Sequence, residues 1–414
     1  MKDSGPLDLD KLFSPVANNK TIALAVSGGA DSLALMVLVS RWKKQLSSPP
    51  QFHVYSVDHG LRDEAQDEVK FVLTTARDLG FEARNLVLGA ARTPASQAMA
   101  RRGRYQVICQ AMAEDRAEVL LTGHHAHDQG ETVLMRLAHG SGISGLAGMR
   151  RFASVEGVEI FRPLLDISRE KLARVVEEAQ IRPVIDPSNC DERYERVRWR
   201  KVMPHLGELG LDFRGLNRFS SRMARADRAL EHMSRSKFSE VVSNEGFGIF
   251  SILNTSLMAE PEEISIRLLS LMLDGASGKA GSGELAQVEA LCGALRTDRF
   301  RGQTLAGCCV ELYEDRLLVF RETGRIEERR IRLKPGEKKL WDRRFLIENT
   351  GKNEIFLLCS SGLSRFEAER LLGREVPYPM SAIHGAPLVV DAEEKPLALG
   401  EAVFGAGVRV RPYL

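Results

Sequence analysis

The stretch that decides the fold is TIALAVSGGADSLALMVLV, residues 21–39. An apolar, strand-like run ends in Ser-Gly-Gly-Ala-Asp-Ser, and an apolar run of helical length follows directly. Gly28 and Gly29 let the backbone approach a ligand closely, and the start of the helix offers free N–H groups and the positive end of its dipole. The turn therefore predicts an anion site, although a glycine pair alone also fits an ordinary tight turn between a strand and a helix.

Apolar runs alternate with helical patterns from this turn to about residue 180. The strand-like runs cover 21–26, 52–58, 84–89, 118–123 and 159–165. The helical patterns cover 32–46, 64–80, 95–114, 129–140 and 168–180. This alternation is typical of β-α-β units around a parallel sheet that is covered on both faces. We therefore expect a doubly wound α/β fold in this part of the chain.

The second half of the sequence follows a different pattern. Mainly helical text runs from about 212 to 297, and short strand-like runs return from 303 onward with one helical pattern at 364–373. A chain of 414 residues also exceeds the usual size of one domain. We predict an α/β catalytic domain over 1–211, a mainly helical domain over 212–325 and a small α+β domain over 326–414.

Composition limits the possible classes of protein. The 58 lysines and arginines oppose 56 acidic residues, a net charge of +2, so any surface for a polyanion must be local. The six cysteines form no C-x-x-C pair, which favours reduced thiols in a cytoplasm. The amino terminus is acidic where a signal peptide is basic, and no apolar run approaches about twenty residues. We expect a cytoplasmic protein without a membrane partner.

Polar residues follow three of the strand-like runs. There is no G-x-x-x-x-G-K-[ST] motif, so β,γ-phosphate cleavage is not implied, and Asp31 beside the first turn suggests either a bound Mg²⁺ or an oriented α-phosphate. Ligands of open α/β sheets bind outside the carboxyl ends of the strands, where all of these residues are expected to meet. After the second and fourth runs they are Asp58, His59, His124, His125, Asp128 and Glu131.

Asp128 and Glu131 are three residues apart at the start of a predicted helix, so both carboxylates share one face. Two carboxylates with nearby imidazoles suit Mg²⁺ or the orientation of an amine nucleophile. A zinc site is the weaker alternative, because the sequence places neither a cysteine nor a fourth ligand there. Ordinary strand ends and a solvated helix start would account for the same residues without any ligand.

Motifs in the first 206 residues resemble a known family. S-G-G-x-D-S resembles the PP-loop of the ATP pyrophosphatases, which split ATP between its α- and β-phosphates. HHAHDQGET and GSGISGLAGM resemble the H-H-x-x-D-Q-x-E-T and G-S-G-x-x-G-L-x-G-M segments of the tRNA(Ile)-lysidine synthetases, and RPLL, SR and DPSN follow in that family's order. His127 stands where an aspartate is usual, and Val197 where an asparagine is usual. The later half is only loosely similar.

The resemblance implies an enzyme that joins free L-lysine to the wobble cytidine of the isoleucine tRNA with a CAU anticodon. Cytosine O2 would attack the α-phosphate of ATP, pyrophosphate would leave, and the lysine ε-amine would then displace AMP, with Mg²⁺ as cofactor on Asp31. The resemblance assigns ATP to Ser27, Gly28, Gly29, Ala30, Asp31, Ser32, Asp58 and His59. It assigns catalysis to Asp31, Asp128, Glu131 and Arg196. It assigns the lysine pocket to His124, Asp128, Glu131, Asp186 and Asn189, with Ser188 beside them.

Binding of tRNA requires local positive charge, and two segments supply it. Arginines at spacings of four, four and three after residue 212 fall on one helix face with few acidic partners nearby. Such a stripe is ordinarily a solvated surface, but the scarcity of acids favours RNA. The segment RRGRY at 101–105 adds guanidinium groups beside an aromatic ring. The expected tRNA-binding residues are Arg101, Arg104, Tyr105, Arg198, Arg214, Arg218, Arg222 and Arg225.

Two other functions fit parts of the sequence. A tRNA thiolase would share the loop and an RNA partner, yet it needs thiol or iron–sulfur chemistry, which the missing C-x-x-C pair disfavours. A non-catalytic, nucleotide-binding RNA chaperone would lack tRNA-dependent conversion of ATP to AMP. The sequence leaves open a homodimer, the way in which isoleucine tRNA is distinguished from methionine tRNA, and the role of the last domain.

Overall fold

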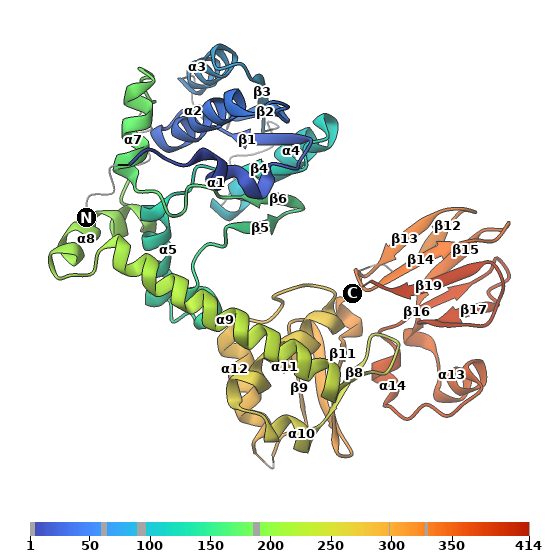
Figure 1. The fold of residues 1–414 in the computed structure, drawn as a ribbon. Coiled ribbons are helices and arrows are strands. Elements are labelled where there is room, and N and C mark those ends of the chain that lie inside the picture. Colours follow the sequence, from blue (N-terminus) through green and yellow to red (C-terminus); the bar gives the residue numbers. More distant parts are fainter. Residues whose placement is uncertain are drawn as a thin grey trace. The chain divides into compact units, whose positions relative to one another are not determined.

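The computed structural model describes residues 5–58, 64–88, 97–184, 191–297, 299–327 and 330–413. The chain divides into two compact units, Met1–Asp227 and Arg228–Leu414, each with its own sheets and apolar cores (Figure 1). Within these described ranges, no helix is both long and apolar enough to cross a membrane.

The first unit is built on a six-stranded sheet in the order β3-β2-β1-β4-β6-β5. The parallel strands are β1 Thr21–Ala25, β2 Gln51–Asp58, β3 Glu82–Val87, β4 Val119–Leu121 and β6 Val158–Phe161, as the sequence predicts. The strand β5, Phe152–Val155, was not predicted and pairs antiparallel with β6 at the edge. Its turn uses Glu156 and Gly157, both with positive φ.

Helices cover both faces of this sheet, which confirms the doubly wound α/β fold. One face packs against α1 (Leu9–Phe13), α2 (Ala30–Gln45), α3 (Glu64–Asp78) and α7 (Arg169–Glu178), and the other against α4 (Gln97–Asp115). Successive side chains of a strand point to opposite faces. Ile22 and Leu24 of β1 accordingly lie in the first core, and Ala23 lies in the second.

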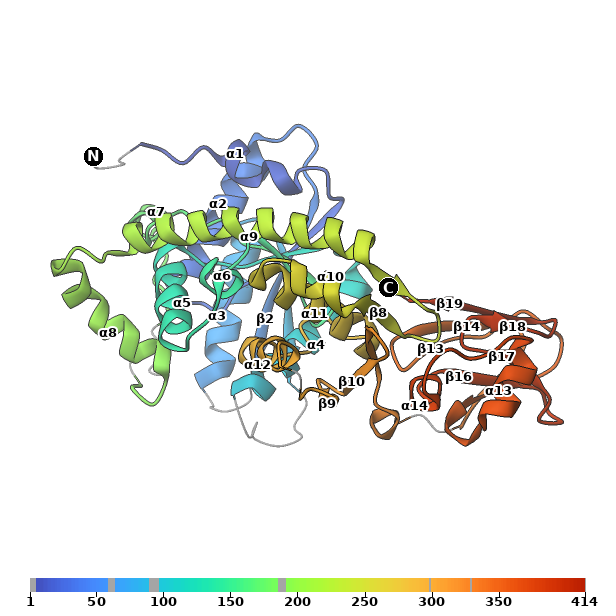
Figure 2. The ribbon, with the colours of Figure 1, turned by 90° about the horizontal axis from the view of Figure 1, so that it is seen from below.

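Four further helices begin in this unit. They are α5 (Ala126–Ala138), α6 (Ile143–Leu146), α8 (Glu195–Glu208) and α9 (Phe213–Val241). Helix α9 is continuous through the unit boundary (Figures 1 and 2). Its first half packs on α5, because Leu216 joins the cluster of Val133 and Leu134 and the Ser220 hydroxyl donates to Ala147 O at 2.8 Å. The compact units therefore divide within α9, and the three-domain division at 211 and 325 stays a prediction.

The second unit begins with an antiparallel sheet covered by helices. The sheet contains β7 (Val242–Asn244), β8 (Phe250–Leu253), β11 (Arg316–Arg321), β10 (Cys308–Tyr313) and β9 (Gly302–Leu305). Its core is shared with α10 (Asn254–Ala259), α11 (Glu262–Ser277) and α12 (Leu285–Leu295). The helical middle region is confirmed, but β7 and β8 were not predicted. The run 304–313, interpreted as one strand, turns at Ala306 and Gly307 into two strands.

Two antiparallel sheets and two helices complete this unit, confirming the α+β ending. One sheet contains β12 (Arg330–Leu333), β15 (Ile355–Cys359), β16 (Pro387–Val390), β17 (Pro396–Leu399) and β18 (Ala402–Val403). The other contains β13 (Lys338–Trp341), β14 (Phe345–Asn349) and β19 (Val408–Pro412), and both share one core. The helices are α13 (Arg365–Leu372), which the sequence predicts, and α14 (Met380–Ile383).

Candidate active site

The turn between β1 and α2 has the geometry of an anion site. Gly28 has φ +82°, and a Cβ there would lie 3.2 Å from Val184 and 3.3 Å from Val72, so the turn requires glycine. The Ser32 hydroxyl donates to Gly29 O at 2.9 Å and accepts the Ser27 N–H at 3.2 Å, which holds the loop in place. Gly29 at the N-cap supplies no side-chain acceptor, so the amino terminus of α2 stays open to an anion.

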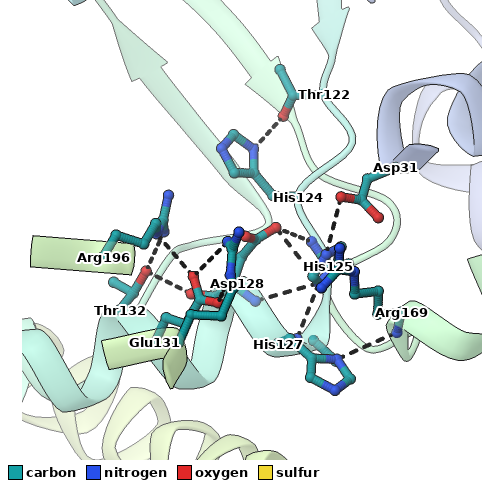
Figure 3. A network of polar contacts seen from close by, with 12 residues as sticks. Asp31, Thr122, His124, His125, His127, Asp128, Glu131, Thr132, Arg169 and Arg196 are labelled. Atoms are coloured by element: carbon teal, nitrogen blue, oxygen red, sulfur yellow. Dashed lines mark hydrogen bonds and ion pairs between the residues drawn. The ribbon is translucent and has the colours of Figure 1, made fainter. Parts of the chain in front are cut away.

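His125 links the amino termini of α2 and α5 (Figure 3). Its Nδ1 accepts the backbone N–H groups of His127 at 3.1 Å and Asp128 at 3.4 Å, while Asp128 Oδ2 accepts the His125 N–H at 3.0 Å. Because Nδ1 is an acceptor, Nε2 carries the proton, and it lies 3.4 Å from Asp31 Oδ2. Only 3% of His125 is exposed, so this bridge is rigid. No separate role was predicted for His125 from the sequence.

Asp31 fits a magnesium ligand. Its Oδ1 is buried and has no hydrogen-bond partner among the described residues, which leaves an acceptor to be satisfied by something else. Burial alone would raise the pKa of Asp31, but the hydrogen bond from His125 and the nearby arginines Arg169 and Arg200 lower it and keep the group ionised. Mg²⁺ commonly takes one or two carboxylates and completes its shell with phosphate and water oxygens. Three or more metal-ligating side chains do not gather anywhere in the described residues, so a cage made of protein alone is not present there.

His124 lies close to the same site as a neutral side chain. Its Nδ1 is 2.9 Å from the Thr122 hydroxyl (Figure 3). Burial lowers its pKa to about 4; Asp128 opposes this shift, and the cationic Arg162, Arg196 and Arg101 add to it. The imidazole is therefore uncharged near neutral pH and can orient a ligand by hydrogen bonding.

Glu131 docks α8 onto α5. The carboxylate is 3% exposed, and it receives Arg200 Nε at 2.8 Å and Arg200 Nη2 at 3.2 Å. Arg196 Nε lies 3.1 Å from the same carboxylate, and Arg196 Nη2 donates to the Thr132 hydroxyl at 3.0 Å. The structure thus brings together the predicted pair Glu131 and Arg196. Arg200 was missed, although its spacing of four from Arg196 puts it on the same face of α8.

The glycine-rich segment 140–149 is clamped rather than open. The side-chain amide of Gln129 makes two hydrogen bonds to the backbone of Met149: it donates to Met149 O at 3.1 Å and accepts the Met149 N–H at 2.7 Å. Arg136 donates to Gly145 O at 2.7 Å and to Gly148 O at 2.8 Å. Gln129 and Arg136 of α5 therefore hold this glycine-rich segment against the helix.

The other predicted residues fall into three groups. Asp58 is buried at the end of β2, while His59, Asp186, Ser188 and Asn189 lie outside the described residues. Val184 donates its N–H to Gly28 O at 2.9 Å and so lies beside the glycine turn. Tyr105 is buried in the core of the sheet under an exposed Arg101. Arg198 of α8 donates to the backbone oxygens of Glu192 and Arg193, just before that helix.

The two departures from the family pattern have structural explanations. His127 stacks on Phe213 with ring centroids 3.9 Å apart, and its Nδ1 accepts the Arg169 N–H at 3.3 Å. Val197 is buried, with 8% of its surface exposed. The His127 ring therefore packs against α9 and the start of α7, and Val197 is a buried apolar residue of α8.

Comparison with known proteins gives a consistent result. Residues 5–206 match the PP-loop domain family. The tRNA(Ile)-lysidine synthase of Rhodopseudomonas palustris is 40% identical over 75% of this chain and 92% of its own. The tRNA(Ile)-lysidine synthase of Bradyrhizobium diazoefficiens is 35% identical over 77% of this chain and 95% of its own. That of Wolbachia pipientis wMel is 32% identical over 84% of this chain and 83% of its own. The chain therefore belongs to the tRNA(Ile)-lysidine synthase family of PP-loop, ATP-using ligases.

Proposed function

We propose that this protein joins L-lysine to C2 of the wobble cytidine in the isoleucine tRNA with a CAU anticodon, converting ATP to AMP and pyrophosphate. The observation that carries the proposal is the Asp31–His125–Asp128 bridge, which fixes a phosphate-binding helix start beside a second carboxylate. Membership of the family supports the choice of tRNA, lysine and ATP. A homodimer stays a prediction.

In the first step, the cytosine O2 attacks the α-phosphorus, the bond to the bridging β-oxygen breaks, and pyrophosphate leaves. The Gly28 turn and the N–H groups at the start of α2 hold the phosphates, with Ser27, Ala30 and Ser32 completing the cradle. Asp58 and His59 are assigned to the adenosine end. Mg²⁺ on Asp31 would supply charge neutralisation. The contribution of the protein is mainly positioning and electrostatic stabilisation, as in other phosphoryl transfers.

In the second step, the ε-amine of lysine attacks C2, the C2–O2 bond breaks, AMP leaves and the nitrogen releases its proton. The amine must be neutral to attack, so a carboxylate must orient it and accept a proton. We assign this role to Asp128, because only one of its oxygens is held by the His125 N–H within the described residues. Arg196, positioned by Glu131, neutralises charge on the departing phosphate. His124, Asp186 and Asn189 shape the pocket.

The test is incorporation of labelled lysine into a CAU-anticodon isoleucine tRNA transcript with ATP and Mg²⁺, using a methionine tRNA as the control substrate. Asp31→Asn and Asp128→Asn should abolish incorporation, and Asp67→Asn, an exposed acid on α3, should not. Asp31→Asn should also weaken ATP binding, whereas Asp128→Asn should leave it intact. AMP release with another acceptor and no lysine incorporation would retain the PP-loop chemistry and reject this substrate.

A further inference from the structure

A groove of about 940 Å³ runs between α7 and the first half of α9. Its α9 wall carries the four exposed arginines of the predicted stripe, and its α7 wall adds two more basic residues. These six are Arg214, Arg218, Arg222, Arg225, Lys171 and Arg174. All of them belong to the first compact unit.

The positive charge of the groove is largely uncompensated. Two acidic side chains line it, and both are engaged: Asp166 by Arg151, and Glu170 by His127 Nε2 at 3.5 Å. Among the described residues, no ion pair reaches Arg174 or any of the four α9 arginines. A chain with a net charge of only +2 thus gathers these five arginines, without ion pairs among the described residues, along one groove, which is the pattern that attracts a polyanion.

The groove ends beside the active site. Phe213 and Ala126 line it, and the Phe213 ring stacks on His127, two residues from His125. The arginine stripe runs from Arg214 to Arg225, which is 12 residues of helix and about 16 Å at 1.5 Å per step. Measured along the axis of a nucleic-acid duplex, that length corresponds to about five phosphates of one strand, at about 3.4 Å of axis per phosphate.

We propose that the groove binds the sugar–phosphate backbone of the tRNA strand that leads, within the anticodon arm, to the base being modified. This inference rests on the proposed function for the identity of the RNA. Contacts to phosphates fix register and orientation without reading sequence. The groove would therefore deliver the unpaired base to the site while leaving recognition of the anticodon to other residues.

The experiment measures equilibrium binding of an anticodon stem-loop RNA and of full-length tRNA across a salt series, without lysine. For the double variant Arg218→Ala/Arg222→Ala, the slope of log K against log[salt] should shrink by about 1.4 to 1.8, the share of two phosphates. Affinity at low salt should fall at least about tenfold, by the same factor for both RNAs. Arg174→Ala, on the opposite wall, should reduce the slope by about half as much.

Arg228→Ala is the matched control, because it removes an exposed arginine of the same helix that lies outside the groove lining. It should change neither the slope nor the affinity, and ATP binding should be normal in every variant. An unchanged slope in the double variant overturns the groove assignment, even if lysine is incorporated. A loss restricted to full-length tRNA overturns the assignment to the anticodon arm. A groove-dependent slope without any lysine incorporation by the wild type would retain the groove and reject the proposed function.

Discussion

His125 combines two tasks that other residues can perform only separately. Its Nδ1 caps α5, and its Nε2–H points at Asp31 from the opposite side of the ring. An asparagine also caps helices but is too short to make the second contact. We expect His125→Asn to preserve thermal stability and to raise the Mg²⁺ requirement about tenfold, the usual cost of losing an orienting partner. His125→Ala should in addition lose about 1 kcal/mol of stability.

The measurement for His125 is the Mg²⁺ titration of ATP binding, followed without turnover, alongside thermal unfolding. A wild-type Mg²⁺ dependence in His125→Asn would show that Asp31 needs no orientation from this ring. Equal loss of stability in the asparagine and alanine variants would show that the cap cannot be replaced.

His124 makes stability depend on pH. Because burial lowers its pKa from 6.5 to about 4, the unfolded chain binds a proton in that window and the folded chain does not. The free energy of unfolding therefore falls as pH drops from 6.5 toward 4. Between pH 7.5 and pH 5 we expect the free energy of unfolding to fall by about 2 kcal/mol because of His124, at about 1.4 kcal/mol per pH unit.

The check on His124 is urea unfolding of the first unit at both pH values, followed by Trp42 and Trp199 fluorescence with Trp341→Phe as background. His124→Gln should lose this pH dependence, since glutamine does not titrate. Identical pH slopes in the variant and the parent would contradict the assigned cause.

At the scale of elements, α8 depends on one buried carboxylate. Glu131 is almost fully buried, while Arg196 and Arg200 are 39% and 34% exposed, so solvent screens part of the interaction. Breaking a buried ion pair costs about 3–5 kcal/mol, and we expect about 2 here after screening. Glu131→Gln should therefore loosen α8, seen as faster amide exchange over Glu195–Glu208. The matched control, Glu178→Gln, opens an exposed pair with Arg41 and should change exchange little.

The sequence predicted elements that carry a long apolar pattern and missed those that do not. The strands β1 and β4 were found because each buries a nearly continuous apolar run, and the helices between the strands were found from their helical patterns. The edge strand β5 alternates exposed and half-exposed side chains, so it has no apolar run. The hairpin turn at Ala306 and Gly307 places a non-glycine residue at positive φ, which the sequence pattern does not indicate. Asp31 and Asp128 were identified from motifs, whereas the bridging role of His125 depends on a tertiary contact.

At the scale of the whole molecule, a buried Arg–Asp–Arg cluster connects the first sheet of the second unit to the sheets that follow it. Asp342 Oδ2 receives Arg321 Nε and Arg344 Nε, each at 2.9 Å, and connects β11 to the turn between β13 and β14. Burial lowers the pKa of Arg344 to about 10, and its Nη1 finds no hydrogen-bond partner in the described part of the chain. One carboxylate thus offsets two buried cations, so its removal should be costly.

Asp342→Asn should destabilise the second unit by about 3–5 kcal/mol, because two guanidinium groups remain buried without a counter-charge. The first unit has its own cores and contains the proposed ATP site, so ATP binding should persist while the second unit unfolds at a lower temperature. Calorimetry with and without ATP should then resolve two transitions, of which ATP raises only one. Glu354→Gln, which opens the exposed pair with Arg332, is the control and should leave the profile unchanged. A single transition that shifts as a whole would mean that the two units unfold cooperatively through α9.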